Sequence, residues 1–245
     1  MRDLDRYQAE YLANYGFERH MVRYRRKLVL ERIAEHRHDR ILEVGCGLEP
    51  LFEHLDDWRS YTIVEPGREF AARASAKIPA GRDVLVHQGI LEDAAVALHG
   101  RAFDLIVVSS LLHEVQEPAR LLTAVRALCG PDTVVHINVP NARSLHNVLA
   151  VKMGLLADVF GRSPLADTMQ RTGTFDLAAL TDLVATAGFS VVANGTYFLK
   201  PFTHGQLQRM LEQQIIDERV LDALFDVVAE LPGLGAELYV DVKPA

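Results

Sequence analysis

The chain has 245 residues, of which 49% are hydrophobic and 24% charged, and this suits one folded domain with a substantial core. The formal net charge of -7 argues against general nucleic-acid binding, which gains most of its affinity by neutralising phosphates. No apolar run reaches the roughly 20 residues that span a bilayer, and the first six residues lack a secretory apolar region. We therefore expect a cytoplasmic protein with no membrane partner. Its two cysteines, Cys46 and Cys129, are expected to be free thiols.

The N-terminal segment, residues 3–38, is predicted to form one or two helices with a break at Gly16, because apolar residues recur at spacings of three and four. Its second half concentrates cations in an otherwise acidic protein. These cations either form a solvated helix face or line a pocket. In the second interpretation, three side chains contact an anionic group of a substrate or cofactor: His20, Tyr24, and either Arg23 or Arg26.

Residues 41–44 are predicted to form a short buried strand that runs into a glycine-rich turn, and a helix can start at or just after Pro50. Gly45 and Gly47 let the backbone turn sharply and approach a ligand, and the amides of the following helix offer partial positive charge. This pattern indicates a nucleotide-type pocket. A turn that only joins a strand to a helix would have the same pattern.

The next apolar strand, at residues 61–66, ends in a carboxylate. In doubly wound sheets the ligand lies across the carboxyl ends of the strands, and an acid about twenty residues after the glycine turn accepts hydrogen bonds from ribose hydroxyls. Glu65 fits that role. The alternative is an acidic helix cap beside Pro66.

Strands and helices alternate along the following hundred residues, which predicts a parallel sheet with helices on both faces. We divide the chain into an N-terminal helical lid (1–38), a core (39–200), a helical insertion (202–234) and a last strand (236–243). The insertion is expected to be two helices that pack on the core or form a homodimer. The predicted elements between the lid and the insertion are a helix at 68–77, strands at 84–89 and 103–110, a helix at 118–128, a strand at 133–139, a helix at 176–187 and a strand at 189–199.

Four motifs, in one order over residues 40–140, resemble class I S-adenosylmethionine-dependent methyltransferases. They are Glu43-Val44-Gly45-Cys46-Gly47, then Glu65, then Phe103-Asp104-Leu105-Ile106 with Leu111-Leu112-His113-Glu114-Val115, and finally Ala127-Leu128-Cys129-Gly130-Pro131. The resemblance implies an α/β fold, a doubly wound and mostly parallel seven-stranded Rossmann-like sheet, with S-adenosylmethionine as cofactor and S-adenosylhomocysteine as product. A nicotinamide dehydrogenase would need glycine at Pro50, which argues against NAD.

The resemblance also implies where the cofactor lies. Its methionine part would contact Glu43 and the turn, its ribose Glu65, and its adenine the residues after the third strand. Two positions depart from the family pattern: Glu49 replaces the third glycine, and Ile90 replaces the acid that meets the adenine amine, so backbone groups, Glu92 or Asp93 are the alternatives there. The cofactor-binding candidates are Glu43, Gly45, Cys46, Gly47, Glu65, Pro66, Gly89, Ile90, Leu91 and Ser109.

Methyl transfer is an in-line displacement that needs a placed nucleophile and, for a hydroxyl, a base. His113, just beyond the fourth strand, is the candidate general base, with a positioning or structural role as the alternative. Asn141, Arg143 and His146 are expected at the rim where a substrate enters, although Asn141 could instead cap the next helix. No metal site is expected. Residues 153–160 are apolar, whereas residues 161–164 and 172–174 are turn-rich and polar, and together they are expected to form a mobile flap.

The whole pattern is similar to small-molecule methyltransferases of bacterial polysaccharide and natural-product pathways. This implies a small-molecule acceptor, either a sugar, a phosphorylated metabolite or a natural-product intermediate, methylated at oxygen. Three alternatives remain open: methylation of a small amine, an enzyme that acts on protein or RNA, and a non-catalytic partner subunit that binds the cofactor.

Overall fold

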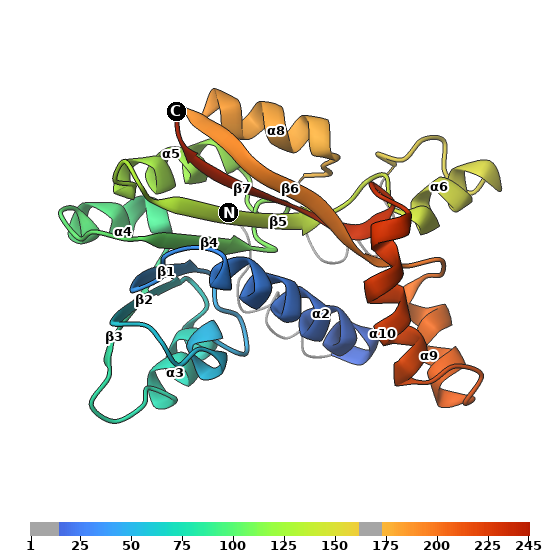
Figure 1. Ribbon diagram of the computed structural model, residues 1–245, viewed down its shortest axis with the longest axis horizontal. Helices are drawn as coiled ribbons and strands as arrows, with labels where there is room; N and C mark the ends of the chain where they lie inside the picture. Colours follow the sequence, from blue (N-terminus) through green and yellow to red (C-terminus); the bar gives the residue numbers. More distant parts are fainter. Residues whose placement is uncertain (1–14, 162–172) are drawn as a thin grey trace.

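The computed structural model describes residues 15–161 and 173–245. At its centre is a seven-stranded sheet with the order β3-β2-β1-β4-β5-β7-β6, in which β7 runs antiparallel to both neighbours and the other paired strands are parallel (Figure 1). This confirms the doubly wound, mostly parallel α/β fold. The strands are β1 (Arg40–Val44), β2 (Ser60–Glu65), β3 (Asp83–Gln88), β4 (Leu105–Ser109), β5 (Val134–Pro140), β6 (Phe189–Leu199) and β7 (Gly235–Pro244).

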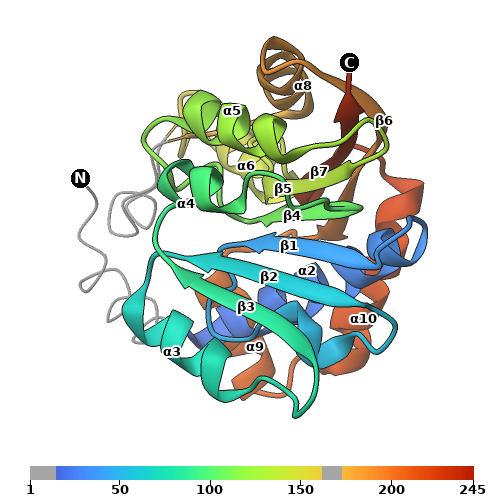
Figure 2. The same ribbon diagram turned by 90° about the vertical axis from the view of Figure 1, so that its left-hand side faces the viewer.

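Helices cover both faces of the sheet (Figure 2). One face carries α4 (Leu91–Leu98), α5 (Pro118–Leu128) and α8 (Leu177–Thr186), and the other carries α2 (Tyr15–Ala34), α3 (Arg68–Ala76) and the 3-10 turn η1 (Leu51–His54). The central strands β1 and β4 are buried along almost their whole length because helices cover both of their faces. Among the described residues, no helix is long and apolar enough to cross a membrane.

The insertion forms α9 (His204–Glu212), α10 (Glu218–Asp226) and the 3-10 turn η2 (Val227–Glu230), and it packs on the molecule's own core. Tyr24 of α2 stacks between Phe198 and Phe225, at ring-centroid distances of 4.7 and 5.4 Å. The two predicted helices of the insertion are therefore confirmed, and their apolar faces are buried against α2 and the end of β6.

Gly16 lies in the first turn of α2, and the helix predicted before it falls in residues 1–14, outside the described residues. Three details differ from the sequence predictions. Pro50 begins a short 3-10 turn rather than an α-helix. β3 is an edge strand and half-buried, whereas a fully buried strand was expected. The helix α4 was not predicted. Of the expected flap, residues 162–172 lie outside the described residues, and α6 (Leu145–Lys152) precedes it.

Candidate functional site

Glu43, near the end of β1, stabilises the turn that follows this strand. Its buried carboxylate accepts hydrogen bonds from the Tyr61 hydroxyl at 2.8 Å and from the Leu51 amide at 3.2 Å. Burial raises the pKa of Glu43 to about 8, although these two hydrogen bonds oppose the rise. Gly45 and Gly47 have φ angles of +78° and +56°, a region that glycine adopts without strain. Glu43 thus braces the turn, and its contact with a cofactor stays a prediction.

Glu65 connects this turn to the end of β2. Its carboxylate accepts hydrogen bonds from the Gly67 amide at 2.7 Å and from the Gly47 amide at 3.2 Å, and the side chain is 5% exposed. Burial raises the pKa of Glu65, while the two amides lower it. A carboxylate has about four lone-pair sites, and Cys46 also donates to this one, so only the sites left after these bonds are available to a ribose hydroxyl. The geometry fits the predicted ribose acid.

The residues expected near an adenine lie where β3 meets α4. The Gly89 amide donates to the Glu65 carbonyl at 3.0 Å, which fixes this junction beside the end of β2. Ile90 is 44% exposed, but Leu91 is 1% exposed and packs in the main apolar core. Leu91 can therefore offer a ligand only backbone atoms, and its place beside an adenine stays a prediction. Two further candidates, Cys46 (7% exposed) and the half-buried Pro66, flank the crevice.

Ser109, at the carboxyl end of β4, begins a buried chain of polar groups. Its hydroxyl accepts from the Asn138 amide nitrogen at 2.9 Å, and that nitrogen also donates to His136 Nε2 at 3.1 Å. The Ser110 amide donates to the Asn138 oxygen at 3.0 Å, and this contact sets which way the carboxamide faces. His136 Nε2 therefore accepts, so its proton is on Nδ1 and is donated to Asp241 at 2.7 Å.

Asp241 is the other end of this chain, and we call the whole set the Asp241 network. Its second oxygen accepts from Arg32 Nη2 at 2.7 Å and contacts His36 Nε2 at 3.2 Å. Burial alone would raise the pKa of Asp241, but hydrogen bonds from His136, Arg32 and His36 outweigh it and lower the pKa to about 2. The network consists of Ser109, Asn138, His136, Asp241, Arg32 and His36.

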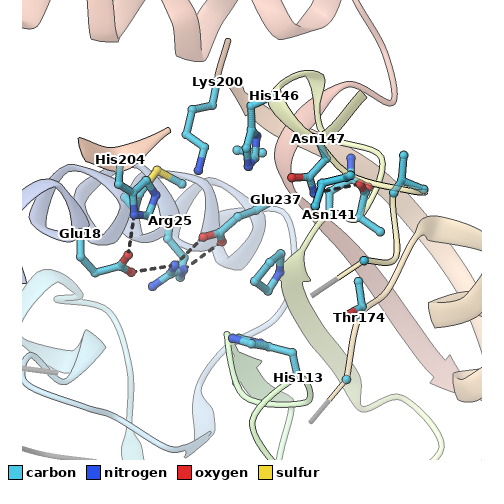
Figure 3. Close-up of a pocket in the computed structure, with 18 residues that line it drawn as sticks. Glu18, Arg25, His113, Asn141, His146, Asn147, Thr174, Lys200, His204 and Glu237 are labelled. Atoms are coloured by element: carbon cyan, nitrogen blue, oxygen red, sulfur yellow. Dashed lines mark hydrogen bonds and ion pairs between the residues drawn. The ribbon is translucent and has the colours of Figure 1, made fainter. Parts of the chain in front are cut away.

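A cavity of about 140 Å³ lies beyond the carboxyl ends of β4 and β5 (Figure 3). Buried His113 forms part of its wall, and its Nε2 lies 3.7 Å from Glu114 Oε1. The parallel strands β4, β5 and β6 end at this edge and the antiparallel β7 begins there, so segments far apart in sequence meet. The polar lining residues are Glu18, Arg25, His113, Asn141, His146, Asn147, Thr174, Lys200, His204 and Glu237.

Of the rim residues expected after β5, Asn141 and His146 line the cavity and exposed Arg143 does not. The Asn141 amide nitrogen donates to the carbonyls of Gly233 and Gly235 at 3.0 and 2.8 Å, so it anchors the start of β7. It does not cap α6, whose N-cap is Ser144. The joint role of Arg143 and His146 on one ligand is therefore not seen.

Three of the α2 candidates face α10 instead of the cavity. Arg23 forms ion pairs with Glu218 at 2.6 Å and Asp222 at 3.0 Å, the Tyr24 hydroxyl donates to Asp222 at 2.8 Å, and His20 Nδ1 lies 3.4 Å from Glu218. Carboxylates of the insertion hold all three side chains, and none of them is among the described residues that line the cavity. Their contact with a substrate stays a prediction that this cavity does not support.

The other expected cation, Arg26, pairs with Glu49, the acid that stands at the usual glycine position. Arg25 is the α2 cation that lines the cavity, and the sequence analysis did not assign it there. A helical spacing could have shown that Arg25 lies on a different face from Arg23 and Arg26, but not which face meets the sheet.

His146 has an unusual environment. Its Nδ1 atom is buried and has no hydrogen-bond partner among the described residues. Burial, with a smaller effect from Lys200, lowers the pKa of His146 to about 3, so the imidazole is neutral at pH 7. It offers the cavity an uncharged polar group.

This low pKa predicts an acid-dependent cost in stability. The unfolded chain binds a proton at His146 below about pH 6.5, whereas the folded chain does so only near pH 3, so lowering the pH favours unfolding. From pH 7 to pH 5, we expect the stability of His146→Gln relative to the wild type to rise by about 2 kcal/mol. Urea unfolding of both proteins at pH 7 and pH 5 measures this difference in the free energy of unfolding. Subtracting the wild-type value removes the contribution of the other titrating groups, which both proteins share. An equal pH effect in both proteins would contradict the assignment, and His99→Gln, at an exposed site, is the control.

Residues 17–194 match the family described as a methyltransferase domain, and no curated protein sequence matches. A Thermotoga maritima S-adenosylmethionine-dependent methyltransferase, described as a possible histamine N-methyltransferase, is 16% identical with a TM-score of 0.60, covering 96% of this chain and 94% of that one.

Two further solved structures share the fold over almost the whole chain. One is from a complex between the Haloferax volcanii Trm112 methyltransferase activator and a putative methyltransferase, with 11% identity, a TM-score of 0.65, and coverage of 98% of this chain and 96% of that one. The other is the plantazolicin methyltransferase BamL with a triazolic desmethylPZN analogue and S-adenosylhomocysteine, with 13% identity, a TM-score of 0.58, and coverage of 98% and 97%.

Proposed function

The chain belongs to the methyltransferase-domain family and is an S-adenosylmethionine-dependent methyltransferase, and from that premise we propose that it methylates a hydroxyl of a small-molecule acceptor. One observation carries this proposal. His113, 2% exposed, lines a cavity at the carboxyl end of β4, beside the crevice where the cofactor binds in this fold. A buried imidazole at that place suits the removal of a hydroxyl proton.

The proposed cofactor site uses the turn at Gly45 and Gly47, the free lone pairs of Glu65, and Ser109. When bound, S-adenosylmethionine supplies an electrophilic methyl group on its sulfonium. Ser109 is fixed by Asn138, and Glu65 by two backbone amides, so both are held in place before any ligand arrives. Because these side chains are already ordered, little side-chain entropy is lost when the cofactor binds.

His113 has the proposed role of general base. As the acceptor oxygen forms its bond to the methyl carbon and the carbon–sulfur bond breaks, His113 takes the hydroxyl proton. Glu114, 3.7 Å from Nε2, stabilises the resulting imidazolium by its charge. The imidazolium then releases the proton to solvent, which leaves a methyl ether and S-adenosylhomocysteine as products.

Calorimetry with S-adenosylmethionine and S-adenosylhomocysteine, followed by a methyl-transfer assay on small alcohols, amines and carboxylic acids, tests the proposal. We expect cofactor binding and turnover on hydroxyl acceptors, with the methyl group on oxygen by mass spectrometry. Turnover on amines alone would contradict methylation at oxygen. Cofactor binding without turnover on any acceptor would instead indicate a non-catalytic binding subunit.

The ribose assignment gives a separate expected result. Glu65→Ala should weaken cofactor binding by about 1–3 kcal/mol, or about 5- to 150-fold in Kd, since the ribose hydroxyls and two backbone amides lose their acceptor. Calorimetric titration with S-adenosylhomocysteine measures the change. Glu69→Ala, on the exposed side of α3, is the matched control and should leave Kd unaltered. The same Kd in both variants would contradict the role of Glu65.

A further inference from the structure

Three charged side chains form one end of the cavity, and we call them the Arg25 cluster: Glu18, Arg25 and Glu237 (Figure 3). Arg25 Nε donates to Glu237 Oε2 at 2.9 Å, and its Nη2 donates to the other oxygen of Glu237 and, at 3.3 Å, to Glu18. The side chains are 14%, 4% and 17% exposed for Arg25, Glu237 and Glu18. The guanidinium is therefore held in one orientation by two carboxylates.

The remaining nitrogen of Arg25, Nη1, makes no hydrogen bond within residues 15–161 and 173–245. It carries two N–H donors, and the residue lines the cavity. Glu18 and Glu237 add carboxylate oxygens that accept hydrogen bonds. This end of the cavity thus offers donors and acceptors side by side.

The charge of the cluster decides which ligands it suits. One guanidinium against two carboxylates gives a net charge of -1 when all are ionised, so a phosphate or carboxylate near Arg25 would also meet Glu18 and Glu237. Lys200, at another part of the lining, balances this charge (Figure 3). The described lining therefore holds two fixed cations and two carboxylates, with His146 neutral.

A hydroxyl group is the chemical match for this arrangement because it both accepts and donates hydrogen bonds. It can accept from Arg25 Nη1 and donate to a carboxylate oxygen of Glu18. An ammonium group can only donate and would leave Nη1 without an acceptor. An anion can only accept and would face two carboxylates.

The size of the cavity limits the group that enters it. A cavity of 150 Å³ in another protein holds benzene, so about 140 Å³ has room for one six-membered ring. Apolar side chains also line the space, among them Met21, Leu156 and Val159, and these can pack on the C–H faces of a ring. The lining thus combines polar and apolar side chains.

We propose that the acceptor presents an uncharged, hydroxyl-bearing six-membered ring, such as a pyranose or cyclitol unit, and that Arg25 determines this specificity. One ring hydroxyl lies between Arg25 Nη1 and Glu18, and the hydroxyl to be methylated lies at His113. This inference rests on the proposed function. It departs from the expectation of a phosphorylated acceptor, since Arg23, Arg25 and Arg26 are all paired with carboxylates.

The first test compares acceptors that share one ring: methyl α-D-glucopyranoside, glucose 6-phosphate, glucuronate and glucosamine, with myo-inositol as a second uncharged ring. We expect kcat/KM at least tenfold higher for an uncharged ring than for its charged counterparts. Equal or better use of a charged ring would overturn the inference and leave hydroxyl methylation standing. Methylation of simple alcohols but of no ring in this set would also overturn it. The absence of hydroxyl methylation on any compound would overturn the proposed function itself.

The second test changes the cluster. Arg25→Lys should raise KM for the uncharged ring about tenfold, with kcat and cofactor Kd within twofold of the wild type, because a lysine cannot keep the forked contact to Glu237 and a free donor together. Glu18→Gln keeps the shape of the side chain and removes one negative charge, so it should raise kcat/KM for glucose 6-phosphate relative to kcat/KM for the uncharged ring. Arg23→Lys, on the same helix outside the cavity, is the control. Unaltered KM and unaltered charge preference in folded Arg25→Lys and Glu18→Gln proteins would overturn the inference.

Discussion

Asp241→Asn is expected to lower the free energy of unfolding by about 3–5 kcal/mol, because removing one partner of a buried ion pair leaves the other charge uncompensated. Asp241 is fully buried, and its oxygens bind His136, Arg32 and His36. Asparagine keeps the volume of the side chain, so the loss measures charge and hydrogen bonding rather than a cavity. Urea unfolding at pH 7, followed by circular dichroism, gives the value.

The control for this change is Asp39→Asn, which removes an exposed ion pair with Arg37. Such pairs contribute about 0–1 kcal/mol, so a similar loss in both variants would contradict the buried network. The pH dependence provides a second check. Because folding lowers the pKa of Asp241 to about 2, below its usual 3.8, its contribution is present above pH 3.8 and is lost as the pH falls through 2.

His113→Gln is expected to reduce turnover by about 10²- to 10⁴-fold, the usual contribution of a general base, while cofactor affinity stays within twofold. Glutamine fills a similar space and keeps a hydrogen-bonding group, but it does not accept a proton near neutral pH. Steady-state kinetics on the best hydroxyl acceptor, with calorimetry for the cofactor, separates the two quantities.

The control for this prediction is His99→Gln, at an exposed site after α4. A wild-type rate in His113→Gln over the whole pH range would contradict the base assignment and leave a positioning role. A large loss of cofactor affinity in the same variant would indicate instead that His113 shapes the crevice.

The arrangement of the glycine turn and Glu65 was predictable because its sequence signals are local. Gly45, Gly47 and Glu65 lie within two adjacent strands and their turns, and the strand-end rule for parallel sheets brings them to one edge. The alternation of apolar strands and helices also fixed the order of elements through β6. The helix α4 was missed because only eight residues form it, between two strand signals.

The acceptor side was less predictable because it depends on pairings between distant residues. Sequence spacing showed many cations on α2, but it did not show which element each of them contacts. Arg23 pairs with Glu218 of α10, and Arg25 pairs with Glu237 of β7, which is 212 residues further along the chain. His136 and Asn138 carried a usable signal. Residues two apart on a strand lie on the same face of the sheet, and buried polar side chains need hydrogen-bond partners. Two such residues on a buried strand therefore indicate a buried hydrogen-bond network.

Helix α2 is attached to β7 at two points, by Arg25 to Glu237 and by Arg32 to Asp241. Seven helical residues rise about 10 Å and four strand residues about 13 Å, so both pairs can form together only when the helix lies along the strand. The partners are 212 and 209 residues apart in the chain. These two attachments can therefore form only once β7 lies beside α2, whereas α2 also packs through Val29 and Ile33 against the β1 side of the sheet. The cofactor turn, built from neighbouring segments, can take shape before the wall of the acceptor cavity exists.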